Sequence, residues 1–222
     1  PSDGARLWTG GRALWLTASG AARWNQASPA RQQGSFTAIA VAPDDSNIVL
    51  AGTNTGSILR NEKALAGDGQ WTGVAPRAGY VSWLAFDPAD HNLVYATYST
   101  FGGTHVWRSA DGGATWTGID GAGTGALPDV PVHSIVVDPQ NRNRLFIGTD
   151  VGVFATTDGG ETWAVESGAP NVVTEALALN AGSNTSQLFA FTYGRGAWRT
   201  ALGAKDCRYS LSPASVNVKA EG

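Results

Sequence analysis

The chain has 222 residues, with 15 Lys or Arg against 18 Asp or Glu, so its formal net charge is −3. A charged fraction of 15% without any run of basic residues argues against nucleic-acid binding, which needs clustered Lys and Arg. No stretch approaches the roughly 18 consecutive apolar residues of a membrane span, and Cys207, the single cysteine, has no disulfide partner within the chain.

A repeated unit runs along the sequence. Tryptophans recur at separations of 47, 45 and 47 residues, at Trp24, Trp71, Trp116 and Trp163. A second landmark lies nine residues before three of them, at Trp15, Trp107 and Phe154, whereas the second unit has Leu59 there and three inserted residues. Self-similarity at this period is typical of repeat architectures.

Each unit predicts four short strands. In the clearest one they cover residues 134–137, 145–149, 153–156 and 162–165, with turn residues between them and no helical periodicity. The first strand of each unit is apolar without alternation, as expected for a strand buried on both faces. Four strands per repeat of this length predict an all-β fold, a β-propeller of four-stranded antiparallel blades.

Two turns between the third and fourth strands share a pattern of residue types. Aspartate can accept hydrogen bonds from turn N–H groups, glycine permits positive φ, and tryptophan covers the hairpin. The matching residues are Ser109, Asp111, Gly113, Thr115 and Trp116 in one turn and Thr156, Asp158, Gly160, Thr162 and Trp163 in the other. We interpret these residues as structural, since a hairpin device recurs in every blade and an active site does not.

These turns resemble the Asp-box, or BNR, motif S/T-x-D-x-G-x-T-W. Over residues 1–202 the repeats resemble those of sialidases, xyloglucan-degrading glycoside hydrolases, sortilin-type receptors and photosystem assembly factors. The resemblance implies a propeller whose Asp boxes lie away from the active site, and it leaves the function open.

The repeat predicts a partial ring. Pro1 aligns with the turn that follows a first strand, and no fourth strand follows residues 197–200, so residues 1–202 amount to about four blades of a ring of six to eight or more. Because exposed sheet edges favour further pairing, we expect a companion chain to complete the ring. We interpret the chain as a proteolytic fragment whose partner is the N-terminal part of the same precursor.

The style of the sequence changes near its end. Residues 203–206 read as a linker, and residues 207–222 resemble the first strands of a bacterial Ig-like module of the BACON type. An unstructured tail, or an outer strand for the last blade formed by residues 216–218, are the alternatives. Such modules imply an exported protein, secreted or periplasmic, with any signal peptide upstream of Pro1.

The sequence shows no catalytic constellation. A glycosidase needs two opposed carboxylates, and the candidates are Asp129, Asp150, Glu166 and Glu175, none with a visible partner. His91, His105 and His133 lack metal-ligand spacing. We predict no metal site and no cofactor, and whether the chain is an enzyme stays open, with glycoside hydrolysis as the candidate activity.

A ligand face is predicted where the second-to-third strand loops and the connections between blades gather. Aromatic rings beside Arg and Asp can stack on and hydrogen-bond a polysaccharide or a protein. The residues so placed are Tyr98, Phe101, Asp150, Tyr193, Arg195, Arg77 and Tyr80. The first hypothesis is therefore a non-catalytic ligand-binding or scaffold propeller of an exported multi-domain bacterial protein. The alternative is a sialidase- or xyloglucanase-like glycoside hydrolase whose active site is shared with blades outside this chain.

Overall fold

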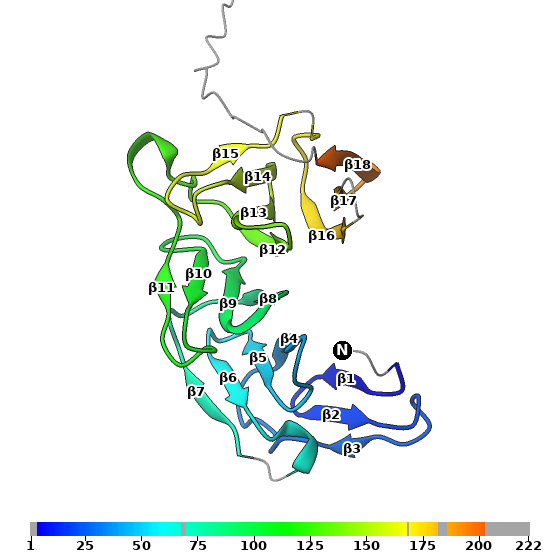
Figure 1. Ribbon diagram of the computed structural model, residues 1–222. Helices are drawn as coiled ribbons and strands as arrows, with labels where there is room; N and C mark the ends of the chain where they lie inside the picture. The colour runs from blue at the N-terminus through cyan, green and yellow to red at the C-terminus, as the bar shows by residue number, and fades with distance from the viewer. Residues whose placement is uncertain (1–3, 68–69, 168, 182–185, 203–222) are drawn as a thin grey trace, which may run out of the picture.

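The computed structural model describes residues 4–67, 70–167, 169–181 and 186–202. These residues form five antiparallel sheets, and the only helical elements among them are two single 3-10 turns. The sheets follow one another along an open arc, from β1 (Leu7–Gly10) at one end to β18 (Gly196–Leu202) at the other (Figure 1). The fold is the predicted β-propeller.

Three central blades have four strands each, hydrogen-bonded in chain order. The second blade consists of β4 (Phe36–Val41), β5 (Val49–Thr53), β6 (Ile58–Asn61) and β7 (Thr72–Val74). The third consists of β8 (Val81–Asp87), β9 (Asp90–Tyr98), β10 (Val106–Ser109) and β11 (Thr117–Gly118). The fourth consists of β12 (Val132–Asp138), β13 (Asn141–Thr149), β14 (Gly152–Thr156) and β15 (Ala164–Val165).

The two outer blades have three described strands each. The first contains β1, β2 (Leu14–Thr17) and β3 (Asn25–Gln26), and the fifth contains β16 (Thr174–Ala181), β17 (Ser186–Thr192) and β18. These six strands are the ones that the repeat predicts for the first and last units. The linker at 203–206, the Ig-like module or tail at 207–222 and Cys207 lie outside the described residues, and their assignments stay predictions.

The apolar core lies between blades rather than within them. Leu50 of β5 packs in one cluster with Val81 and Val94 of the next blade, and Tyr95 of β9 packs in another with Ile147 of β13. The first and second strands are therefore covered on both faces, which explains their apolar runs without alternation. Apolar contact between neighbouring blades therefore holds the blades together in the arc.

Buried aspartates stabilise the turns at one edge of the arc. Asp138 is fully buried, accepts the N–H of Gln140 (2.9 Å) and pairs with Arg144. Asp87 is buried in the same place of the third blade, and Arg142 from the fourth blade donates to it (2.8 Å). A buried charge needs such a partner. The Asp138–Arg144 pair stabilises a hairpin turn within the fourth blade, and the Asp87–Arg142 pair connects the third blade to the fourth.

The turns between third and fourth strands have the predicted hydrogen bonding. Asp111 accepts the N–H groups of Ala114 (3.0 Å) and Thr115 (2.8 Å), and Asp158 accepts that of Thr162 (3.0 Å). Hydrogen bonds from Thr115 and then Ser109 lower the pKa of Asp111 to about 2. Trp163 is buried, whereas Trp116 is only partly so.

The first blade builds the same turn without an aspartate. Ser19 stands where Asp111 stands in the third blade, and its hydroxyl accepts the N–H of Arg23 (3.2 Å), while Thr17 accepts that of Ala21 (3.3 Å). Ala21 has φ 74°, in the position that Gly113 holds with φ 98°. Backbone geometry is thus kept where the sequence motif is lost.

Candidate functional site

The loops predicted to carry function share one edge of the arc, which we call the upper face: residues 53–56, 75–80, 98–103, 121–131, 150–152 and 193–196. They join β5 to β6, β9 to β10, β13 to β14 and β17 to β18, and connect the blades. Backbone hydrogen bonds link neighbours, from Ser99 N–H to Tyr80 O (3.1 Å) and from Asp150 N–H to Pro131 O (3.2 Å). The turns around Asp111 and Asp158 lie at the other ends of the strands.

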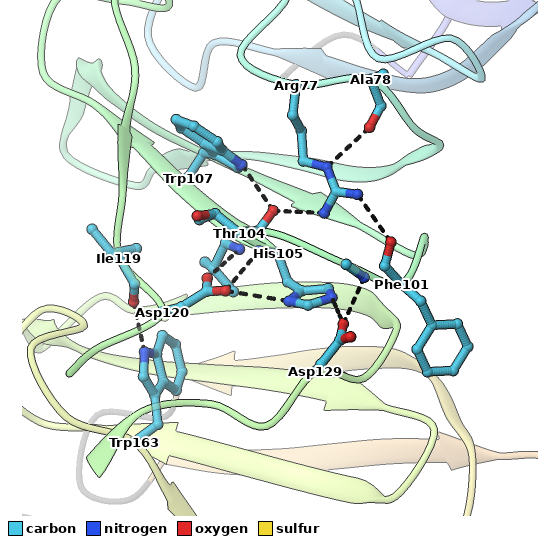
Figure 2. A network of polar contacts seen from close by, with 12 residues as sticks. Arg77, Ala78, Phe101, Thr104, His105, Trp107, Ile119, Asp120, Asp129 and Trp163 are labelled. Carbon is cyan, nitrogen blue, oxygen red and sulfur yellow. Dashed lines mark hydrogen bonds and ion pairs between the residues drawn. The ribbon is translucent and has the colours of Figure 1, made fainter. Parts of the chain in front are cut away.

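The guanidinium of Arg77 forms three hydrogen bonds with backbone carbonyls of the protein. Its guanidinium donates to the carbonyls of Ala78 (2.9 Å), Thr104 (2.9 Å) and Phe101 (3.3 Å), as Figure 2 shows. It also lies over the ring of Tyr98, 5.5 Å from the ring centroid. Arg77 therefore holds the 98–104 loop in place with three of its five N–H donors.

Tyr98, expected as a ligand contact, is fully buried. Its hydroxyl donates to the carbonyl of Gly56 in the preceding blade (2.9 Å), and burial raises the pKa of this phenol. A ring with no exposed surface cannot stack on a ligand. Tyr98 instead ties the second-to-third strand loops of two neighbouring blades together.

Three predicted aromatic residues do reach solvent on the upper face. Tyr193 is 77% exposed, Phe101 62% and Tyr80 45%. Phe101 points away from the polar network at its base (Figure 2), whereas its carbonyl is held by Arg77. Arg195, two residues after Tyr193, is exposed as well. These side chains are the part of the predicted ligand face that a ligand can touch.

His105 is a buried imidazole between two carboxylates (Figure 2). Its Nδ1 lies 3.2 Å from Asp120 Oδ2 and its Nε2 lies 3.1 Å from Asp129 Oδ1, the second contact being an ion pair by distance without hydrogen-bond geometry. Asp120 also accepts the N–H of His105 and of Val106, both at 2.7 Å. Asp129 accepts the N–H of Gly102 (2.7 Å), so this network anchors the base of the Phe101 loop.

A second His–Asp pair lies in the fourth blade. His133 Nε2 is 2.6 Å from Asp150 Oδ1, and both side chains are partly exposed, 19% and 35%. Asp150 was predicted at this face, but its partner His133 was not. The pairing was hidden because His133 lies in β12 and Asp150 in the loop after β13, 17 positions apart.

The candidate acids of the sequence are not equivalent in space. Glu166 is buried and follows β15, whereas Glu175 is exposed on β16. Asp129 and Asp150 both belong to the upper face, and each lies against a histidine. Within the described parts of the chain, no group of three or more His, Cys, Asp or Glu is placed to hold a metal ion. The upper face thus offers carboxylates, the partly exposed imidazole of His133 and exposed aromatic rings.

The chain is similar in sequence to xyloglucanases, while no family model matches it. It is 31% identical over 113 residues to a xyloglucanase of Hypocrea jecorina, covering 50% of this chain and 12% of the relative. It is 30% identical over 92 residues to a xyloglucanase of Paenibacillus sp, covering 39% of this chain and 8% of the relative. The chain therefore spans only a small part of the length of these curated relatives.

Solved structures show the same fold. An ancestral GH74 enzyme matches with a TM-score of 0.67 at 20% identity, over 86% of this chain and 26% of that one. The β-propeller domain of Cps50 (Swd1) from Myceliophteria thermophila matches with a TM-score of 0.66 at 14% identity, over 91% of this chain and 66% of that one. At such identities the likeness establishes a β-propeller and nothing about activity.

No helix among the described residues has the length and apolar character needed to cross a membrane.

Proposed function

We propose that this chain is the glycan-binding part of a xyloglucanase-like propeller of an exported protein, and that the upper face binds a β-glucan such as xyloglucan. The observation that carries the proposal is the exposure of Phe101, Tyr193 and Tyr80 at this face. Similarity to two xyloglucanases at about 30% identity supports the class of ligand. It favours the glycoside-hydrolase hypothesis over a scaffold without a ligand.

The chemistry of the face suits a sugar polymer. Aromatic rings offer apolar surfaces on which pyranose rings stack, and nearby charged groups hydrogen-bond the sugar hydroxyls. Phe101 projects from a loop held by Arg77 and Asp129, so little ordering entropy remains to be lost when a sugar binds it. An exposed face lined by separate rings accommodates an extended chain.

The turns at 109–116 and 156–163 we assign as Asp boxes with a structural role. The carboxylates of Asp111 and Asp158 accept hydrogen bonds within their own turns, at the edge opposite the upper face. If the assembled protein hydrolyses its ligand, Asp129 and Asp150 are this chain's candidate carboxylates. Hydrolysis would then require a second carboxylate on the other side of the glycosidic bond, about 5–10 Å from the first. The proposed source of that second carboxylate is a companion part of the ring.

Affinity electrophoresis of the full chain in gels containing xyloglucan, carboxymethyl cellulose or mannan tests the proposal. Phe101→Ala should weaken xyloglucan retardation about fivefold, since a stacked aromatic contact contributes ~1 kcal/mol. Trp15→Ala is the control, because Trp15 is a 39% exposed ring on β2 of the first blade, away from the Phe101 loop. Retardation by none of the three glycans, or equal retardation of wild type and Phe101→Ala, would reject the proposal. Release of reducing sugar ends measures hydrolysis separately.

A further inference from the structure

The inner strands of four blades share a β-bulge at their second residue. Register shifts occur there in β4, β8, β12 and β16, so one residue in each strand has no partner on the neighbouring strand. Bulges redirect a side chain out of the regular pattern of a sheet. The four equivalent bulge residues are Thr37, Ser82, His133 and Glu175.

In two blades the bulge residue joins its blade to the next one. Thr37 Oγ1 donates to the carbonyl of Val81 (2.7 Å), and Ser82 Oγ donates to the carbonyl of Val132 (2.5 Å). Val81 and Val132 are the first residues of the following inner strands. A hydroxyl at the bulge thus has a structural role that repeats with the blades.

The fourth and fifth blades do not carry that hydroxyl. His133 directs Nε2 to Asp150 Oδ1 at 2.6 Å. Glu175 is exposed, and an ionised carboxylate has no proton to donate to a carbonyl. At His133, which lies beside the inner strand of the fifth blade, an imidazole paired with a carboxylate therefore stands where the second and third blades have a hydroxyl.

A second observation marks the same place. Ser134, next to His133, is fully buried, and its Oγ has no hydrogen-bond partner among the described residues. A Cβ on Gly148 would lie 2.8 Å from that Oγ and 2.6 Å from the carbonyl of Thr174. The start of β16 therefore comes close against the fourth blade, as Figure 1 shows for β12 and β16. Because even a methyl group at Gly148 would clash with both atoms, the interior of this contact is filled. A ligand therefore has to approach from the solvent side, where His133 and Asp150 are partly exposed and Glu175 is exposed.

We propose that His133, Asp150 and Glu175 form a site for sugar hydroxyls where the inner strands of the fourth and fifth blades meet on the concave side of the arc. The site deepens the proposed function, on which it rests. Asp150 and Glu175 accept hydrogen bonds from adjacent hydroxyls of one sugar unit, and the His133–Asp150 contact fixes the orientation of both partners. Phe101 and Tyr193 provide the stacking surfaces, and this site provides the polar recognition.

The repeat supplies the decisive variant, His133→Thr. It restores the residue type that holds this position in the second blade, so it should leave the melting temperature equal or higher by forming a bond to Thr174 O. It should also weaken xyloglucan-oligosaccharide binding tenfold or more, as expected when a charge-assisted hydrogen bond is lost. Glu175→Gln, at an exposed position, should weaken binding severalfold with no change in melting temperature.

Thr37→Val is the matched control. It removes the bond to Val81 O at the equivalent bulge, so it should lower the melting temperature by several degrees and leave oligosaccharide affinity unchanged. If His133→Thr and Glu175→Gln both bind like wild type, this site is rejected while the proposed function stands. If His133→Thr lowers the melting temperature as Thr37→Val does and binds normally, His133 is structural. A wild-type chain that binds no glycan rejects the proposed function and this site together.

Discussion

The indole Nε1 of Trp163 donates a 2.7 Å hydrogen bond to the carbonyl of Ile119, 44 residues earlier in the preceding blade. Trp71 makes the same contact with the carbonyl of Ala27, also 44 residues earlier, at 2.9 Å. Both acceptors directly follow the outer strand of a blade, β11 and β3. Trp71 and Trp163 therefore fasten the second and fourth blades to the outer edge of the blade before them. Trp116 instead donates to the carbonyl of Gly113 in its own turn (3.0 Å).

Trp163→Phe should lower the free energy of unfolding by about 1–2 kcal/mol, because the ring stays while the bond to Ile119 O is lost and a carbonyl loses its partner. Urea unfolding followed by circular dichroism measures the change. Trp15→Phe is the control, since Trp15 is 39% exposed, and it should change the free energy by less than about 0.5 kcal/mol. Equal effects of the two substitutions would show that the inter-blade bond contributes nothing.

The architecture could be predicted from sequence because it depends on local repeats. Trp24, Trp71, Trp116 and Trp163 set the period, and apolar inner strands followed by turn residues set the order of strands within each blade. The first and fifth blades have three strands each among the described residues, and that the ring is completed outside this chain stays a prediction. The burial of Asp138 and its pairing with Arg144 could not be predicted, because nothing local shows that a turn residue is buried against an arginine of the following strand.

The candidate site could be predicted only in part. The loops expected at the ligand face do lie together at one edge of the arc, and Phe101 and Tyr193 are exposed there, while ligand binding at this face stays a prediction. The burial of Tyr98 was missed because its hydroxyl reaches Gly56, 42 residues away in another blade. His105 and His133 were set aside for lacking metal spacing, yet each meets carboxylates 15 or more positions distant. Such pairings are set by how blades and loops come together, which no local pattern encodes.

The turn around Asp111 should make stability depend on pH in the acid range. Its pKa is about 2 in the folded chain, lowered by hydrogen bonds from Thr115 and Ser109, against about 4 in an unfolded chain. A lowered folded pKa gives a stabilisation that is complete above about pH 4 and is lost as the pH falls through 2. Asp111→Asn should therefore have a flatter melting-temperature profile between about pH 5 and 2 than wild type. Identical profiles would mean that the carboxylate of Asp111 stabilises nothing.

Ala21→Gly should stabilise the first blade. Ala21 has φ 74°, a left-handed conformation that costs a residue with a Cβ about 1 kcal/mol, and Gly113 and Gly160 hold the equivalent positions in other blades. We expect an increase in the free energy of unfolding of up to about 1 kcal/mol, reduced by the greater chain entropy of glycine when unfolded. Ala22→Gly, where φ is not positive, should destabilise instead. A loss of stability in Ala21→Gly would contradict the strain.

Arg77→Lys should loosen the loop that presents Phe101. The planar guanidinium donates to three carbonyls and lies over the Tyr98 ring, and a lysine ammonium cannot make that combination of contacts. We expect faster amide hydrogen exchange in residues 99–104 and a severalfold weaker glycan affinity, with the propeller still folded.

Arg31→Lys is the matched control for this change, because Arg31 lies over the Phe36 ring at 5.6 Å and donates to the carbonyl of Gln33 (3.3 Å), both outside the Phe101 loop. It should leave exchange in residues 99–104 unchanged. If Arg77 acts through Phe101, then Arg77→Lys should weaken glycan binding little further in a chain that already carries Phe101→Ala. A double-mutant cycle measures this coupling directly. Additive losses would mean that Arg77 contacts the glycan itself, and unchanged exchange in the loop would mean that its three carbonyl bonds do not order Phe101.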